Sequence, residues 1–471
     1  MERFGLFIDG RHQSTLEYYP VIHKYRKVPM AEVAQASPED LNQAVDAAHR
    51  AFRRRWSIHE RSRVLERAAD LLGDHAEEFA LLIAQEAGKP LKESRVEVMR
   101  GQQTLRYSAL AAKTLKGMEV PIAGNPGSER RLAFTIRKPY GVTLAITPFN
   151  FPLNLVLHKV GPALAAGNPV VLKPAPATPL TALKLAELLH EAGVPAGYIN
   201  VVTGQSPEIG ERLVKDSRVE LITFTGSASV GQSIRGQAGL RPVLLELGNN
   251  SANIVHEDAD IEAAARILAA RAFGYAGQVC IAVQRIYVHH PVWKAFRSAI
   301  ERATRELVVG DPEDPRTDVG PMINEAAAER AESWYREALG AGAHALVEGS
   351  RQGAMFSPAL LEDVAPSLRM MSEEVFAPLA GLVPYHDIDE AIAWANESRY
   401  GLQAGIFTQN LGVAMNAAQN LEVGGVMIND SSSYRADNMP YGGIKESGIG
   451  REGPEFAIEE MTYPTVIVFN L

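Results

Sequence analysis

The sequence predicts an α/β protein with two doubly wound domains, each a mainly parallel sheet covered by helices. Three observations predict this fold class. Short β-branched runs alternate with amphipathic stretches about every 20–30 residues, which is typical of βαβ units. The chain has 471 residues, more than one hydrophobic core normally holds, so about two or three domains are expected. A second alternating set from about Ala252 to Val426 indicates a second α/β domain.

Composition narrows the class of protein. With 46% hydrophobic and 22% charged residues, the chain is ordinary for a globular protein. Its net charge of −9 argues against nucleic acid or an anionic membrane as the main partner. We find neither a secretory signal pattern at the N-terminus nor an apolar run long enough to span a membrane. These features predict a soluble, cytoplasmic protein.

The elements of the N-terminal half are predicted from their periodicity. Ser37 precedes an acidic first turn and is the expected N-cap of a helix over residues 37–56. The remaining expected elements are a helical region at 59–88, strands at 141–147, 168–174, 198–204 and 219–227, and helices at 153–167, 181–194 and 207–216.

Two segments stand apart from this alternation. Residues 120–141 read as a loop followed by a strand. The C-terminal run 463–471 reads as an apolar strand with no later segment to pair with, and such a strand is more often docked than free.

Cys280 is the only cysteine, and it lies in the Gly-, Ala- and Gln-rich stretch GYAGQVCIAVQR. A single thiol excludes an internal disulfide and makes a poor zinc site, so no metal site is expected. Two interpretations remain: a small buried hydrophobic residue, or a nucleophile with an oxyanion hole and a base nearby.

Two residues could serve such a thiol. Asn150, in TPFNFPLN at the end of a predicted strand, could donate a hydrogen bond to an oxyanion, although asparagine in a turn is more often structural. Glu246 ends the apolar strand in LLELGNN, where burial would raise its pKa and suit it to general-base catalysis. The alternative for Glu246 is a strand-end carboxylate paired with Arg or Lys.

A nucleotide site is indicated where strands pass into helices. Gly226, Ser227 and Gly231 in FTGSASVG fit a pyrophosphate at a helix N-terminus, although the spacing is not that of the GxGxxG motif. Lys173 in VVLKPAPATPL ends another strand, where a cation could meet a ribose or phosphate.

Seven motifs, in this order, resemble the NAD(P)-dependent aldehyde dehydrogenase superfamily over essentially the whole chain. They are TPFNFPLN, VVLKPA, FTGSASVG, LLELGNN, GQVCIAVQR, EEVFAP and MPYGGIKESGIGREG. Each motif alone is weak evidence, whereas seven in the correct order over about 300 residues are highly specific.

The resemblance implies a mechanism. Cys280 would attack the aldehyde to give a thiohemiacetal whose oxyanion is held by Asn150 and the Cys280 backbone N–H. Hydride transfer to the nicotinamide would leave a thioester, and Glu246 would activate water to hydrolyse it. Lys159 and Glu452 match a proton-relay pair, with a surface ion pair as the alternative. The residues implied in cofactor binding are Thr147, Pro148, Lys173, Gly226, Ser227, Glu374 and Phe376.

Two positions depart from the family pattern. Pro176 stands where NAD-preferring members usually carry a glutamate that binds the ribose hydroxyls. Its absence permits NADP, yet we find no convincing arginine for the 2′-phosphate, so NAD and NADP both remain open. Asn249 replaces a usual glycine after Gly248, which could alter the turn beside Glu246.

The substrate tunnel carries unusual polar residues. Arg100, His158 and Arg435 occupy positions that are commonly apolar or aromatic in the family, and Phe151 is also expected in the lining. For each polar residue alone, a structural role is the better interpretation. Together they predict a short aldehyde with an anionic or hydroxylated tail, gripped by the two guanidinium groups. The surrounding motifs most resemble the subgroup with lactaldehyde and phosphonoacetaldehyde dehydrogenases.

The resemblance also implies an aldehyde dehydrogenase-like architecture. The expected parts are an NAD(P)-binding domain over 1–116 and 136–248, a catalytic domain over 249–446, and a small β oligomerisation arm over 117–135 and 455–471. The arm and C-terminal strand would pair with a neighbouring subunit in a homodimer or homotetramer. Alternatives are a CoA-acylating relative, an acyl-phosphate reductase and a catalytically silent structural homologue. Glu246 argues against the first two.

Overall fold

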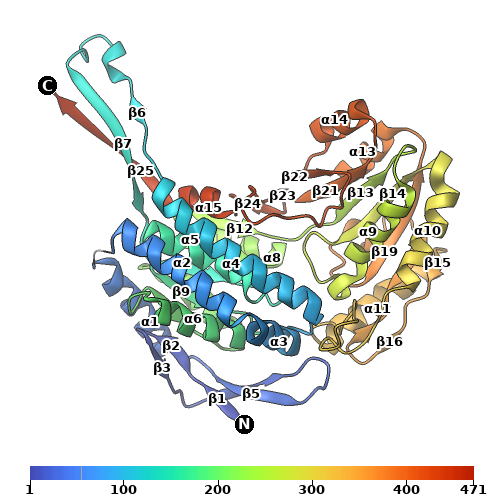
Figure 1. The fold of residues 1–471 in the computed structure, drawn as a ribbon, viewed down its shortest axis with the longest axis horizontal. Coiled ribbons are helices and arrows are strands. Elements are labelled where there is room, and N and C mark those ends of the chain that lie inside the picture. The colour runs from blue at the N-terminus through green and yellow to red at the C-terminus, as the bar shows by residue number, and fades with distance from the viewer. Residues whose placement is uncertain (55) are drawn as a thin grey trace.

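The computed structural model describes residues 1–54 and 56–471. Two large sheets form two lobes, and a third small sheet projects from them (Figure 1). The predicted α/β class is therefore confirmed. Among the described residues, no helix is both long and apolar enough to cross a membrane.

The first lobe is built on an eight-stranded sheet with the order β24-β12-β11-β8-β9-β10-β2-β3. The five strands from β12 to β10 are parallel, and β24, β2 and β3 complete the edges in antiparallel register. Their bounds are β2 Leu6–Ile8, β3 Arg11–Gln13, β8 Thr143–Ile146, β9 Val170–Lys173, β10 Ile199–Val201, β11 Leu221–Thr225, β12 Val243–Glu246 and β24 Gly448–Ile449.

The helices of this lobe match the predicted pattern. Ser37 caps α1 and accepts a hydrogen bond from the Asp40 backbone N–H, as predicted. The bounds are α1 Pro38–Phe52, α2 Ile58–Asp74, α3 Ala76–Ala87, α4 Leu91–Thr114, α5 Asn154–Ala166, α6 Leu180–Ala192, α7 Pro207–Lys215 and α8 Ala228–Gln237. The predicted first helix extended to residue 56; α1 ends at Phe52, and residue 55 lies outside the described residues.

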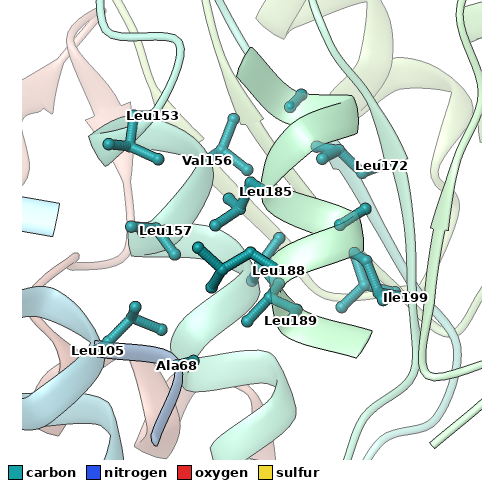
Figure 2. Close-up of a cluster of buried hydrophobic side chains, with 14 of the residues drawn as sticks. Ala68, Leu105, Leu153, Val156, Leu157, Leu172, Leu185, Leu188, Leu189 and Ile199 are labelled. Atoms are coloured by element: carbon teal, nitrogen blue, oxygen red, sulfur yellow. The ribbon is translucent and has the colours of Figure 1, made fainter. Parts of the chain in front are cut away.

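The core of this lobe is a layer of leucines between helices and sheet. Figure 2 shows Leu185, Leu188 and Leu189 of α6 beside side chains of α5 and of strands β9 and β10. Lys173 is the last residue of β9, and Asn150 lies four residues after the end of β8. Because the sheet is closely packed, the backbone positions of these two residues are fixed.

The second lobe holds a seven-stranded sheet with the order β15-β18-β19-β14-β13-β21-β22. All neighbours are parallel except β15 and β18. The strands are β13 Ser251–Val255, β14 Val283–His289, β15 His344–Val347, β18 Ala359–Glu362, β19 Leu379–Tyr385, β21 Gln403–Phe407 and β22 Gly425–Ile428. The α-helices of this lobe are α9 Ile261–Phe273, α10 Trp293–Arg305, α11 Glu325–Gly340, α12 Arg369–Ser372, α13 Ile388–Asn396 and α14 Leu411–Asn420. The last helix, α15 Pro454–Glu460, packs on α4 and α5 and so belongs to the first lobe.

Small elements complete the chain. A three-stranded sheet near the N-terminus has the order β1-β5-β4. The remaining elements are β1 Glu2–Phe4, β4 Tyr18–Ile22, β5 Pro29–Ala34, β16 Arg351–Gln352, β17 Met355–Phe356, β20 Tyr400–Gly401, β23 Ile444–Lys445 and the short 3-10 helices η1 Ile122–Gly124, η2 Gly274–Gly277 and η3 His290–Val292.

The projecting sheet corrects one prediction. We expected the C-terminal strand to lack a partner in its own chain, but β25 (Thr462–Asn470) pairs antiparallel with β7 (Arg131–Pro139) along its whole length. The short strand β6 (Glu119–Val120) lies on the other side of β7. The strand predicted within residues 120–141 supplies this pairing, and one edge of β25 stays open within the described chain (Figure 1).

Candidate active site

Cys280 lies in the loop between η2 and β14, and Asn150 of the first lobe donates a hydrogen bond to Gln278 of this loop. Tyr275, Ala276 and Gly277 before it have φ angles of 52°, 54° and 65°. Gly277 is required, since a Cβ there would lie 2.3 Å from the Ala377 carbonyl oxygen. This left-handed turn brings the cysteine loop tightly against the segment around Ala377.

The sulfur of Cys280 has a hydrogen-bonding partner that the sequence did not reveal. Its Sγ lies 3.0 Å from the Tyr441 Oη, and the residue is half-buried. Burial raises the pKa of the thiol to about 12, helped by the negative charges of Glu374 and Glu246. As the structure stands, the sulfur is a neutral thiol, and ionisation needs further stabilisation of the thiolate.

Asn150 lies beside the cysteine loop, as a carboxamide donor to an oxyanion must. The side chain is 3% exposed, and its Nδ2 donates to the Gln278 carbonyl oxygen at 2.9 Å. Its Oδ1 has no partner among the described residues. The segment before α5 is thus tied to the loop that carries the thiol.

Glu246 ends strand β12 and is 5% exposed. Its Oε2 has no hydrogen-bond partner among the described residues. Burial raises the pKa of Glu246 well above its usual value, and the negative charge of Glu452 raises it further. An unpartnered, desolvated carboxyl with a raised pKa is suited to accept a proton from water.

Behind Glu246 is a buried chain of charges. Lys159 Nζ donates to Glu452 Oε1 at 2.9 Å, and Arg435 Nη2 donates to Glu452 Oε2 at 2.9 Å. Although burial opposes ionisation, Lys159 and Arg435 lower the pKa of Glu452 to about 2. All three side chains are nearly inaccessible, so the alternative of a surface ion pair is wrong for Lys159 and Glu452.

A cleft of about 240 Å³ runs between the lobes and includes Ser227, Glu374 and Tyr400 in its lining. Ser227 precedes α8 with extended backbone angles, and its hydroxyl makes no capping bond; its one side-chain hydrogen bond among the described residues is with Ser229 Oγ at 3.3 Å, so these two hydroxyls stand together at the helix N-terminus, where a phosphate can bind. The Glu374 carboxylate accepts from the Asn249 backbone N–H at 3.2 Å and lies so near Gly248 that a Cβ there would be 2.8 Å from Oε2. Burial raises the pKa of Glu374 to about 7.

Other residues expected at the cofactor lie around the ends of β8, β9 and β11. The Thr147 Oγ1 is buried without a partner among the described residues, and burial lowers the pKa of Lys173. Gly226 follows β11, Pro148 follows Thr147, and Phe376 packs edge-to-face on Phe149 with centroids 5.8 Å apart. The Thr147 hydroxyl, which has no partner among the described residues, and the Lys173 ammonium belong to the donor set that a dinucleotide requires.

The described hydrogen bonds of Asn249, one of the two departures from the family pattern, do not involve Glu246. The Asn249 side chain turns toward the second sheet, where Nδ2 donates to Ser251 Oγ at 2.6 Å and the Gln403 carbonyl oxygen at 3.3 Å. The departure at Pro176 places no carboxylate beside Lys173.

A cavity of about 260 Å³ opens beside Val279 and Ile281, the neighbours of Cys280. Arg100, Phe151 and Arg435, three of the four residues expected in the substrate tunnel, line this cavity. His158 does not line it; the ring is 1% exposed, and its Nε2 lies 3.0 Å from Asp437 Oδ1. Burial lowers the pKa of His158 to about 4, so the ring is neutral near pH 7.

Arg100 and His158 converge on Asp437 rather than on open space. Arg100 makes a bidentate pair with Asp437 at 2.9 and 3.1 Å, and the Asn154 Nδ2 adds a third donor at 3.0 Å. Arg435 is held by Glu452. The sequence suggested two free guanidinium groups, but each has a carboxylate partner. Asp437 is 337 residues from Arg100, and Glu452 is 17 residues from Arg435.

Three further residues were missed by the sequence analysis: Tyr441, Asp437 and Lys89. Lys89 is buried, pairs with Glu97, and lies over the Phe151 ring at 3.4 Å and the Tyr275 ring at 4.7 Å. It thereby joins the segment after Asn150 to the loop before Cys280. Tyr441 stands within a quoted motif, so its position was visible although its contact with the sulfur was not.

One group of metal-ligating residues lies far from this site. Ligand atoms of His256, Glu257 and His289 lie within 4.8 Å of one another near the ends of β13 and β14. The two imidazole rings are stacked with an interplanar angle of 3°, so their in-plane lone pairs do not converge on one point. As arranged, these residues do not form a metal site.

Comparisons with known proteins identify the protein family to which this chain is similar. Residues 11–467 match the profile of the aldehyde dehydrogenase family. The chain is 52% identical to the 3-sulfolactaldehyde dehydrogenase of Priestia aryabhattai, over 100% of this chain and 99% of that protein. It is 38% identical to the lactaldehyde dehydrogenase of Methanococcus maripaludis, over 99% of this chain and 100% of that protein.

Comparison with solved structures also finds aldehyde dehydrogenases. The NADP-dependent glyceraldehyde-3-phosphate dehydrogenase of Bacillus halodurans, complexed with NADP, superposes with a TM-score of 0.97 at 37% identity, covering 100% of both chains. Aldehyde dehydrogenase 21 of Physcomitrella patens, in complex with succinate, has a TM-score of 0.97 at 36% identity, covering 100% of this chain and 98% of that one. The chain belongs to the aldehyde dehydrogenase family. It is an NAD(P)-dependent oxidoreductase that converts aldehydes to carboxylates.

Proposed function

We propose that this enzyme oxidises a short 2-hydroxyaldehyde with an anionic tail, of the 3-sulfolactaldehyde type, through a covalent adduct on Cys280. The identity of 52% with a 3-sulfolactaldehyde dehydrogenase over the full chain is the observation that carries the substrate class. The cavity supports it, because about 260 Å³ suits a small substrate and because Lys89, Arg100, Arg271 and Arg435 contribute cationic side chains to its wall.

In the proposed mechanism, the Cys280 thiolate attacks the aldehyde carbon and forms a thiohemiacetal. The Asn150 Nδ2 and the Cys280 backbone N–H stabilise its oxyanion, for which the carboxamide must turn from Gln278 toward the adduct. The thiohemiacetal carbon then loses a hydride, for which NAD(P) would supply the acceptor when bound, and the adduct on Cys280 becomes a thioester. Glu246 then takes a proton from water, whose oxygen attacks the thioester carbon and releases the carboxylate and the thiolate.

The chain of charges behind Glu246 supports the relay role proposed for Lys159 and Glu452. Both are buried and bonded to each other, and the negative charge of Glu452 contributes to the raised pKa of Glu246. Arg435 joins this chain, so its proposed role changes from gripping the substrate to holding Glu452.

The cofactor residues are proposed from their placement. Ser227 and Gly226 would hold the pyrophosphate at the start of α8, Lys173 would meet the adenine ribose, and Glu374 would accept from the nicotinamide ribose. Thr147, Pro148 and Phe376 would line the nicotinamide end. Because Pro176 brings no carboxylate, nothing there repels a 2′-phosphate, and both NAD and NADP are expected to bind.

Among the cavity cations, Arg271 is the one least neutralised. Lys89, Arg100 and Arg435 each contact a carboxylate at 2.9 Å or less, whereas Arg271 only approaches Glu93 at 3.9 Å. Its side chain is about half exposed. We therefore propose Arg271 as the residue that meets the anionic tail, with Arg100 beside it.

A substrate panel tests this function. Purified protein with NAD or NADP, without CoA, is mixed with 3-sulfolactaldehyde, lactaldehyde, phosphonoacetaldehyde, succinic semialdehyde, glyceraldehyde 3-phosphate or propanal, and reduced nicotinamide is followed by absorbance. We expect the highest kcat/KM for 3-sulfolactaldehyde.

The variant R271M tests the proposed anion contact. It should raise the KM for 3-sulfolactaldehyde about tenfold and change the KM for propanal little. R266M, on the same helix, is the control. A preference for propanal, or equal effects of R271M on both aldehydes, would reject the substrate class, and turnover that requires CoA would reject the hydrolytic mechanism.

We also propose a cytoplasmic homo-oligomer. Val466, Val468 and Phe469 on β25 and Leu132 on β7 are 45–57% exposed, an unusual apolar stretch beside an open strand edge. A second copy of the chain would cover it. Light scattering should give a dimer or tetramer for the wild type and a smaller species for V466K/V468K; a monomeric wild type would contradict the proposal.

The cytoplasm is proposed as the location because the nucleophilic thiol must stay reduced.

A further inference from the structure

Tyr441 is the side chain that holds the sulfur of Cys280. Its hydroxyl lies 3.0 Å from Sγ, and in the described part of the chain no other side-chain hydrogen bond to this sulfur is present. The tyrosine is 2% exposed. The contact therefore occurs in a region where water competes little for either group.

The position of Tyr441 is fixed from two sides. Its backbone N–H donates to the Glu452 carbonyl oxygen at 3.1 Å, and the Glu452 N–H donates back at 2.6 Å. The Arg435 guanidinium lies over the phenol ring, with Cζ 3.7 Å from the centroid. A cation above the ring withdraws electron density and makes the hydroxyl a better donor.

The hydroxyl is available as a donor. Burial raises the pKa of Tyr441 well above its usual value, so the phenol keeps its proton in the working range of pH. A protonated phenol beside a sulfur can either donate to a thiolate or accept from a thiol. Only the first arrangement stabilises the charged form, and a charge-assisted hydrogen bond is the stronger of the two.

We infer that Tyr441 is a catalytic residue whose hydroxyl donates to the Cys280 thiolate, and that Arg435 positions it by stacking on its ring. In this step the S–H bond breaks, the proton leaves to water and the sulfur keeps the electron pair. The O–H bond of Tyr441 stays intact. The inference rests on the proposed role of Cys280 as nucleophile.

Other charges face Cys280 and contribute to its ionisation. Glu246 at the end of β12 and Glu374 after α12 disfavour the thiolate, while Arg435 from the loop before β23 favours it. Lys159 on α5 and Glu452 before α15 lie behind Glu246. All of these groups remain in Y441F, so that variant isolates the contribution of the hydroxyl.

Alkylation by iodoacetamide tests the inference directly. Because Cys280 is the only cysteine, every alkylated thiol is the one in question, and neither cofactor nor aldehyde is needed. The rate is measured by mass spectrometry between pH 7 and pH 9.5, below the thiol pKa, where it is proportional to the thiolate fraction. We expect Y441F to be alkylated about tenfold more slowly at each pH, equivalent to an upward pKa shift of about one unit.

The controls separate this effect from a structural one. Y25F alters an exposed tyrosine in the turn between β4 and β5, outside the lining of the proposed substrate cavity, and it should be alkylated at the wild-type rate. C280S should take up no label. Circular dichroism and the urea midpoint report whether Y441F is folded. If Y441F is misfolded, Y441W provides a second aromatic replacement without a phenol hydroxyl. A rate for folded Y441F within twofold of wild type, or a faster one, would overturn the inference.

This test is independent of turnover. If no aldehyde is oxidised but alkylation slows in Y441F, the proposed substrate fails and the tyrosine–cysteine interaction stands. If turnover is normal and alkylation of Y441F is unchanged, the proposed function stands and the role of Tyr441 is rejected.

Discussion

Replacing Glu452 by glutamine should destabilise the protein and shift the pH at which Glu246 acts as a base. Glu452 is the only carboxylate that the structure shows bonded to both Lys159 and Arg435, each at 2.9 Å. The three side chains are 7%, 1% and 5% exposed. E452Q removes the negative charge and leaves the two cations buried together.

The expected magnitudes follow from this burial. Removing one partner of a buried ion pair costs about 3–5 kcal/mol of unfolding free energy. Glu246 also responds, because its pKa is raised by burial and by Glu452, while Arg435 and Lys159 lower it. Without Glu452, the two cations act on Glu246 unopposed, so the pKa of Glu246 should fall.

The sign of the pH dependence follows from linkage. In the wild type, a raised pKa of Glu246 means that folding favours its neutral form, so stability falls as pH rises through that pKa. In E452Q, ionised Glu246 becomes a partner for the cations. The variant should therefore be most destabilised at low pH and recover partly as Glu246 ionises, and the acid limb of kcat should move to lower pH.

Two measurements check this prediction. Urea unfolding followed by tryptophan fluorescence gives the stability at several pH values, and pre-equilibrated turnover with saturating aldehyde gives the acid limb of kcat. E455Q, an exposed glutamate at the start of α15, is the matched control and should change neither. An E452Q acid limb at the wild-type pH, or a loss of less than about 1 kcal/mol, would refute the coupling described here.

Three further predictions concern other parts of the molecule. P176E should lower kcat/KM with NADP at least tenfold relative to NAD, because a carboxylate beside Lys173 repels a 2′-phosphate; an unchanged ratio would place the 2′-position elsewhere. Burial raises the pKa of Glu86 to about 7, so the wild type should lose stability as pH rises from about 4.5 to about 7, and E86Q should flatten this slope in urea titrations. K89M leaves Glu97 buried without its cation and should lower the unfolding free energy by about 3 kcal/mol, with K92M, a more exposed lysine, as control.

Local sequence determined the alternation of strands and helices. Ser37 capped its helix because its side chain can reach the Asp40 N–H, which is a contact within four residues. The strands around Leu144, Val171 and Ile222 formed where β-branched runs occur, and the resemblance carried by seven motifs gave the family. These features depend on neighbours in the chain, so a single sequence contains them.

Tertiary structure decided which charges meet. Arg100 and Asp437 are 337 residues apart, and Arg435 finds Glu452 rather than a substrate because folding buries both. The C-terminal strand has a partner because β25 returns beside β7, where Thr462 contacts Arg137, 325 residues earlier in the chain. Long-range packing, not periodicity, selects such partners. A buried charge or strand edge is unfavourable without a partner, so it pairs with the opposite charge or the strand that folding brings next to it.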